Sequence, residues 1–282
     1  MQTHYVSCLG QSGFHRLGYR EWAGPRGAPT LLCVHGLTRN GRDFDSLAQA
    51  LSKVYRVVCP DMPGRGISEN LVDSAQYAYP IYLADLATLI ARLDVETVDW
   101  VGTSMGGILG MMMAAQPGTP VRRLVLNDIG AVVAKAGLER IAGYVGIDRN
   151  FETLDALADA MAAAYAGSGK LPRAILMKIA QGAARLKPDG RFGFAYDLRI
   201  ADVFKTAPPQ DVDLFSVWDR IGCPTLVLRG EVSDVLTAET AAQMTKRGPP
   251  AKIVEIARVG HAPWLATSDE IAVVADFLRA PL

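Results

Sequence analysis

The feature that most constrains this chain is the pentapeptide Gly102-Thr103-Ser104-Met105-Gly106, which stands between an apolar run and a helix-forming run. Residues 97–101 are short, β-branched and aromatic, and this pattern predicts a buried strand. Residues 107–116 favour a helix, which Pro117-Gly118 ends. The pentapeptide could instead be a Gly-Ser turn with no catalytic role. A tight turn from strand to helix, however, holds its central side chain above the end of a sheet. The context therefore predicts that Ser104 is a nucleophile.

Apolar runs alternate with helical patterns along most of the chain. The predicted strands cover residues 19–22 (a short edge strand), 30–34, 56–59, 97–101, 123–126, 224–230 and 252–256. The predicted helices cover residues 43–51, 79–93, 107–116, 238–244 and 269–278. Alternation of this kind predicts an α/β fold with a mostly parallel central sheet and helices on both faces.

The alternation stops between residues 131 and 217. Mainly helical windows follow one another there, at residues 138–144, 154–165 and 173–186. We expect residues 1–130 and 218–282 to form the α/β core, and residues 131–217 to form a helical lid, or cap, over the carboxyl ends of the strands.

Two residues downstream of Ser104 complete a candidate catalytic triad. Asp234 lies just past a predicted strand, and His261 lies in the loop after the last strand. A serine hydroxyl needs a base to take its proton, histidine titrates near neutrality, and an acid fixes the histidine tautomer. Asp234 is the predicted acid. Two other carboxylates compete with it: Glu231, which is close by, and Asp128, which follows another strand and could substitute in a variant arrangement.

A nucleophilic serine also needs donors for the oxyanion that its attack creates. The backbone N–H of Met105, at the start of the helix, is one predicted donor. The backbone N–H of Leu37 is the other, because Gly36 lets the chain turn tightly after the strand at residues 30–34. We expect His35 to hold this turn by hydrogen bonds.

Taken together, these motifs resemble the α/β-hydrolase fold superfamily over nearly the whole chain. The shared pieces are His35-Gly36, the loop at residues 61–68, the pentapeptide, the acid after a late strand, and Gly260-His261. The chain is similar in particular to the lidded branch that holds carboxylesterases, enol-lactonases, carbon–carbon bond hydrolases of ring-cleavage products, haloalkane dehalogenases and cofactor-free haloperoxidases. Dehalogenases of this fold use aspartate as nucleophile, so Ser104 argues against that activity.

The resemblance implies a serine hydrolase that cleaves a small carboxylic ester or lactone through an acyl-enzyme. Two alternatives stay open: a carbon–carbon bond hydrolase, and a ligand-binding protein on the same fold without catalysis. The lid lacks the Arg-x-x-x-Trp pattern of ring-cleavage-product hydrolases. Arg39 and Trp264 are candidate pocket residues, with a solvated loop and simple loop packing as the respective alternatives.

Composition limits the partners and the location. Lys and Arg together number 29, as do Asp and Glu, so nothing predicts binding to nucleic acid or to a membrane surface. The four cysteines are scattered without metal-ligand spacing, and we expect no metal and no cofactor. The N-terminus lacks the pattern of a signal peptide, which favours a cytoplasmic protein. A small-molecule substrate is the expected partner, and a homodimer is left open.

Overall fold

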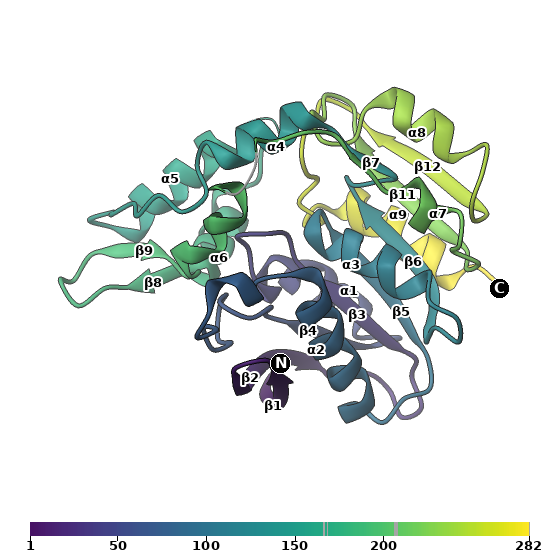
Figure 1. Cartoon of the computed structure of the whole chain (residues 1–282), viewed down its shortest axis with the longest axis horizontal. Coiled ribbons are helices and arrows are strands. Elements are labelled where there is room, and N and C mark those ends of the chain that lie inside the picture. Colours follow the sequence, from purple (N-terminus) through teal and green to yellow (C-terminus); the bar gives the residue numbers. More distant parts are fainter. Residues whose placement is uncertain (166, 168, 206–207, 282) are drawn as a thin grey trace.

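An eight-stranded sheet runs through the centre of the molecule in the order β1-β2-β4-β3-β5-β6-β11-β12 (Figure 1). The structure is a computed structural model that describes residues 1–165, 167, 169–205 and 208–281. The strands are β1 (Gln2–Gly10), β2 (Gly13–Trp22), β3 (Thr30–Val34), β4 (Arg56–Pro60), β5 (Val98–Thr103), β6 (Val121–Asn127), β11 (Thr225–Gly230) and β12 (Ala251–Ile256).

Strands β4, β3, β5, β6, β11 and β12 are parallel to one another. Every residue of β3 and of β11 is buried, as the continuous apolar runs of their sequences predict for strands covered on both faces. The carboxyl ends of the parallel strands therefore meet at one edge of the sheet, where the loops that carry the predicted triad begin.

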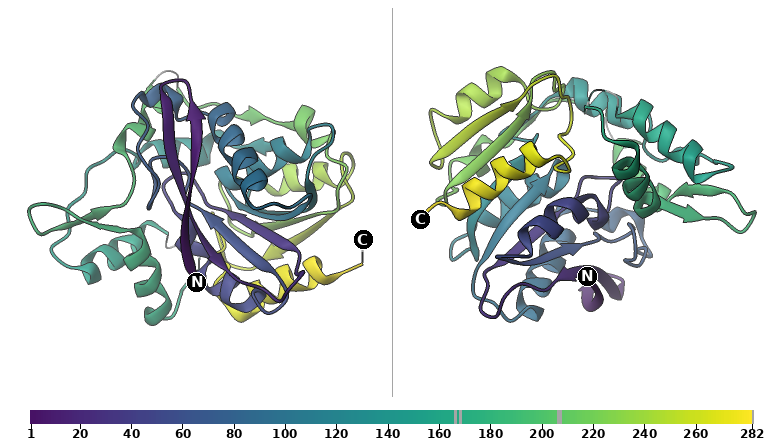
Figure 2. Two further views of the ribbon diagram at one scale, coloured as in Figure 1. Left: turned by 90° about the horizontal axis from the view of Figure 1, so that it is seen from below. Right: turned by 180° about the vertical axis from the view of Figure 1, so that it is seen from behind.

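Helices cover both faces of the sheet, and successive side chains along each strand point to opposite faces. Leu32 of β3 packs on the face that carries α2 (Tyr79–Arg92), α3 (Met105–Ala114), α7 (Phe215–Trp218) and α8 (Ala238–Met244). Leu31 packs on the opposite face, with α1 (Asp45–Leu51) and α9 (Ser268–Arg279). The yellow α9 lies across that second face in Figure 2 (right). The predicted α/β fold with helices on both faces is confirmed. No helix within the described ranges is long and apolar enough to cross a bilayer.

The first two strands form an antiparallel hairpin that the sequence patterns did not predict. β1 pairs with β2 from Gln2 opposite Glu21 to Gly10 opposite Gly13, and β2 pairs in turn with β4. The predicted edge strand at 19–22 is therefore the end of a longer inner strand. Residues 1–18 have mixed polarity and do not show the alternation of apolar and polar side chains that is typical of strands. The turn Gly-Gln-Ser-Gly was the one feature of this segment that could have indicated a hairpin.

Residues 131–217 lie between β6 and β11 and extend beyond the sheet (Figure 1). Helices α4 (Lys135–Ala142), α5 (Leu154–Ala164) and α6 (Arg173–Ala183) overlap the three predicted windows, although α4 begins earlier and the third window ends in a strand. The insertion also holds strand pairs that helical periodicity did not predict: β7 (Val132–Val133) with β10 (Val212–Asp213), and β8 (Ala184–Leu186) with β9 (Phe192–Phe194). A 3-10 helix, η4, covers Leu198–Lys205. We call residues 131–217 the insertion.

Helix α3 packs against the end of β3 so closely that no side chain fits between them. A Cβ atom on Gly106 would lie 2.0 Å from the carbonyl oxygen of Val34. A Cβ on Gly102 would lie 2.3 Å from the carbonyl oxygen of Gly106. These glycines let the first turn of α3 sit directly on β3 and β5.

Replacing Gly106 by alanine should therefore destabilise the protein. We expect Gly106→Ala to lower the free energy of unfolding by about 3 kcal/mol, because the added methyl meets backbone that cannot move aside. Urea denaturation measures the change. The control is Gly222→Ala, since a Cβ there meets no atom within 4 Å. Equal stability of the two variants would contradict this packing argument.

Candidate active site

Ser104 lies at the sharp turn between β5 and α3. Its backbone has φ 51° and ψ −116°, a conformation that L-residues with side chains rarely adopt. The close packing of Gly102 and Gly106 surrounds this strained residue on both sides. The hydroxyl of Ser104 is thereby held at the carboxyl end of the sheet, next to the first turn of α3, as the pentapeptide predicts.

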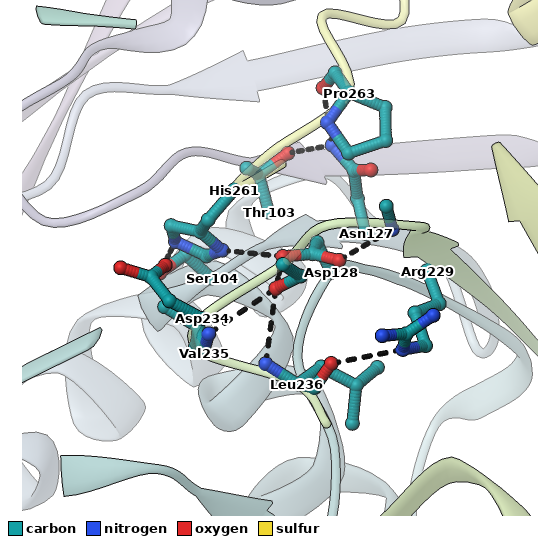
Figure 3. Close-up of polar contacts among 12 residues, drawn as sticks. Thr103, Ser104, Asn127, Asp128, Arg229, Asp234, Val235, Leu236, His261 and Pro263 are labelled. Carbon is teal, nitrogen blue, oxygen red and sulfur yellow. Dashed lines mark hydrogen bonds and ion pairs between the residues drawn. The ribbon is translucent and has the colours of Figure 1, made fainter. Parts of the chain in front are cut away.

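His261 connects Ser104 to a buried carboxylate, and that carboxylate is Asp128. The Nε2 atom of His261 is 2.9 Å from Ser104 Oγ, and its Nδ1 atom is 2.8 Å from Asp128 Oδ2. Figure 3 shows the imidazole ring joined to both partners. The serine, imidazole and carboxylate thus form one hydrogen-bonded line along the ends of β5 and β6.

Asp128 follows β6 directly and is fully buried. Besides His261, it accepts hydrogen bonds from the backbone N–H of Gly230 at 2.7 Å and from the hydroxyl of Ser233 at 2.5 Å. Its own backbone takes a positive φ of 54°. Three donors around one carboxylate compensate the charge that burial would otherwise penalise.

The prediction that Asp234 orients His261 is contradicted by the structure. Both carboxylate oxygens of Asp234 bind the Arg140 guanidinium of α4, at 2.5 and 2.9 Å. Arg140 holds the pKa of Asp234 below its usual range. In the loop after β11, Ser233 turns inward to Asp128, so the next side chain faces the insertion instead. Asp128, the substitute acid that the sequence left open, takes the predicted position of Asp234.

Asn127 fixes the loop that carries His261. Its amide nitrogen donates to Thr103 Oγ1 at 3.0 Å and to the carbonyl oxygen of Pro263 at 2.8 Å, so it ties β5, β6 and this loop together (Figure 3). The backbone N–H of Ser104 donates to the Asn127 carbonyl oxygen at 3.1 Å. Sequence patterns gave no indication of this role, because Asn127 reads as the last residue of a strand.

The predicted oxyanion turn lies next to Ser104. A Cβ placed on Gly36 would be 3.6 Å from Ser104 Cβ, and Leu37 and Met105 line a cavity together with Ser104. Met105 is the first residue of α3, where a helix leaves its N–H without an intrahelical acceptor. The positions of both predicted donors suit a developing oxyanion at Ser104.

His35 holds this turn as a neutral residue. Its Nε2 accepts the backbone N–H of Met62 at 2.9 Å, so Nδ1 carries the proton and donates to the Gly36 carbonyl oxygen at 2.7 Å. Complete burial lowers the pKa of His35 to about 3, and nearby arginines add to the effect. The hydrogen-bonding role predicted for His35 agrees with these contacts.

Two kinds of cavity flank Ser104. The Arg39 cavity, of about 70 Å³, has in its wall Arg39, Ser104, Tyr144, Tyr165, His261 and Trp264. The apolar cavity, of about 520 Å³, also reaches Ser104 and has in its wall Ile108, Ile129, Val133, Leu138, Phe204 and Leu214. Arg39 and Trp264, the two predicted pocket residues, thus both lie in the wall of one cavity with the serine. The insertion contributes to both cavities.

One further group of side chains has the composition of a metal site. Cys8, His15 and Asp85 are buried, with potential ligand atoms within 4.8 Å of one another. His15 Nε2 already bonds Asp85 at 2.9 Å. Burial, with Asp85, raises the pKa of the Cys8 thiol to about 12. The contacts are those of a hydrogen-bonded network that joins the N-terminal hairpin to α2.

Comparison with known proteins agrees with the fold. The chain belongs to the alpha/beta hydrolase family, whose model matches residues 31–276. It is 41% identical over 285 residues to the 3-hydroxybutyrate-oligomer hydrolase of Cupriavidus necator, covering 97% of this chain and 96% of that protein.

Two crystal structures resemble the chain over almost its full length. A protein from Rickettsia typhi has a TM-score of 0.94 and 32% identity, with 100% of both chains covered. An alpha/beta hydrolase from Novosphingobium aromaticivorans has a TM-score of 0.89 and 40% identity, with 98% of this chain and 97% of that chain covered.

The pKa of His35 gives a test of the site's electrostatics. A histidine in the unfolded chain takes up a proton below about pH 6.5, whereas folded His35 does so only near pH 3. The contribution of His35 to the free energy of unfolding is therefore lost as the pH falls from the first value to the second. We expect nitrogen NMR to show a neutral His35 with the proton on Nδ1 from pH 8 to pH 5. A titration of this ring with a midpoint above pH 5 would contradict its buried, neutral role.

Proposed function

We propose that this protein is a serine hydrolase that cleaves the oxygen esters of short hydroxy acids. The observation that carries the proposal is the pair of hydrogen bonds of His261, 2.9 Å to Ser104 and 2.8 Å to Asp128. This arrangement activates a serine hydroxyl, because the imidazole takes the proton while the carboxylate fixes its tautomer.

In the proposed reaction Ser104 Oγ attacks the ester carbonyl carbon and gives its proton to His261 Nε2. The N–H groups of Leu37 and Met105 stabilise the resulting oxyanion. His261 then protonates the departing alcohol oxygen, which leaves an acyl group on Ser104. A water molecule, deprotonated by His261, attacks the acyl-enzyme. His261 then returns that proton to Ser104 Oγ as the carbon–oxygen bond to the serine breaks, which releases the acid and the free serine. Asp128 accepts the Nδ1–H of His261 throughout and stabilises the imidazolium.

The substrate class rests on the relative and on the shape of the cleft. A relative 41% identical over nearly the full length is named a 3-hydroxybutyrate-oligomer hydrolase. An ester of such an oligomer has a chain on both sides of the scissile bond, and Ser104 lies in the walls of two cavities. Cleavage of a lactone or of a carbon–carbon bond would use the same serine, so substrates must distinguish these activities.

Replacing Ser104 by alanine tests the nucleophile. We expect the wild-type protein to hydrolyse 3-hydroxybutyrate dimer and trimer, and Ser104→Ala to lower kcat/KM by at least about 10³-fold. Chromatography of the released monomer measures turnover. Conversion of a ring-cleavage diketone without ester hydrolysis would favour the carbon–carbon alternative. Failure of a fluorophosphonate to label Ser104 would favour a binding protein without catalysis.

Matched asparagine variants identify the acid. Asp128→Asn should lower kcat by about 10³- to 10⁴-fold, because the amide cannot hold His261 in the reactive tautomer. Asp234→Asn should keep kcat within about tenfold, since Asp234 bonds Arg140 and not His261. Steady-state kinetics of both variants, with circular dichroism as the folding control, decide the matter. The reverse order of severity would overturn the assignment of Asp128.

A further inference from the structure

Arg39 is a buried cation beside the nucleophile. It follows the oxyanion turn, and its guanidinium side chain is 10% exposed. The position of a Cβ on Gly36 lies 3.6 Å from Ser104 Cβ and 3.8 Å from Arg39 Cγ, so the arginine stem begins close to the serine. Arg39 also lies in the wall of a second cavity of about 40 Å³, which adjoins the Arg39 cavity under α5.

The hydrogen bonds of Arg39 leave part of its guanidinium unused. Nε and Nη2 bind the carboxylate of Asp43 at 2.8 and 2.5 Å. Nη1 has only the sulfur of Met161, at 4.0 Å, which is a weak acceptor. Burial lowers the pKa of Arg39, while the charge and hydrogen bonds of Asp43 raise it by more. An arginine stays protonated in proteins even without such a partner.

The walls of the two cavities leave the unused N–H groups without a competing anion. Asp43 is the one carboxylate that lines either of them in the described part of the chain, and its oxygens bind the other side of the guanidinium. Arg149, at the surface, adds a second cation to the adjoining cavity. The rings of Tyr144 and Tyr165 complete the wall, with Tyr165 at 5.6 Å from the Arg39 carbon Cζ.

The apolar cavity, which Ser104 also lines, has a different character. Aliphatic and aromatic side chains make up most of its wall, and Asp211 is the single charged residue lining it within the described ranges. The cleft around Ser104 therefore combines a cavity that holds the Arg39 cation with a cavity that is mostly apolar. A substrate with one anionic end and one apolar end has only one favourable orientation in it.

We propose that Arg39 is a specificity-determining residue that binds a free carboxylate of the substrate, so that the enzyme acts on anionic esters near their acid end. This inference rests on the proposed function. The guanidinium offers directed N–H groups, which suit a carboxylate better than a neutral carbonyl. The acid unit lies in the Arg39 cavity, and the remaining chain extends into the apolar cavity.

The test compares an acid with its neutral isostere. 3-Hydroxybutyrate dimer and its terminal carboxamide share the same internal ester, and they differ only in the charge at the acid end. We expect the wild-type protein to prefer the acid in kcat/KM by about 10- to 100-fold. Arg39→Gln should lower kcat/KM for the acid by a similar factor, mainly through KM, and change the carboxamide value less than about threefold.

Two further variants separate recognition from a structural role. Arg42→Gln is the matched control, because Arg42 lies three residues further along the chain, pairs with Asp45 and lines neither cavity. It should leave both substrates unchanged. Asp43→Asn keeps the cation and removes its partner, so we expect it to retain the preference for the acid. An equal loss for both substrates in Arg39→Gln, or loss of the preference in Asp43→Asn, would overturn the proposal.

Binding to an inactive variant keeps this test independent of turnover. Calorimetry of the dimer acid with Ser104→Ala should show binding that weakens at least tenfold when Arg39→Gln is added. If the wild-type protein cleaves neither substrate, the proposed function fails while this measurement still tests Arg39. Equal binding by the two inactive proteins would refute carboxylate recognition.

Discussion

The rest of the site depends on the contact between the first turn of α3 and the end of β3. Because a Cβ on Gly106 would lie 2.0 Å from the Val34 carbonyl oxygen, only glycine allows this approach. The contact brings the turn after β3 next to Ser104 and forces the serine into its strained conformation. The proposed nucleophile and the predicted oxyanion donors are therefore positioned by the same packing.

Polar contacts then connect the insertion to the core on both sides of the serine. Asp234 binds Arg140 of α4 on the side of the β11 loop, and Arg39 lies against Tyr165, just after α5, on the side of the oxyanion turn. The insertion thus completes the cavities beside Ser104. Asp234, although it does not bond the histidine, ties α4 of the insertion to the loop after β11.

Much of this architecture could be predicted from the sequence, because the parallel strands are continuous apolar runs and the pentapeptide has strict packing needs. Which carboxylate bonds His261 could not be predicted. Asp128 and Asp234 both follow strands. The direction of the loop after β11 decides which of them bonds His261, because this loop points Ser233 toward Asp128. The hairpin of β1 and β2 could not be predicted because its side chains have mixed polarity. The partners of Arg39 could not be predicted because they depend on how the insertion packs.

We propose that His261 activates Ser104 and that the backbone amides of Leu37 and Met105 face the reacting carbonyl. The most direct measurement is a crystal structure of the protein after reaction with an organophosphonate. We expect phosphorus on Ser104 Oγ, with the phosphoryl oxygen about 3 Å from both amide nitrogens and His261 still bonded to Asp128. An adduct on another residue, or a phosphoryl oxygen turned away from both amides, would contradict the account.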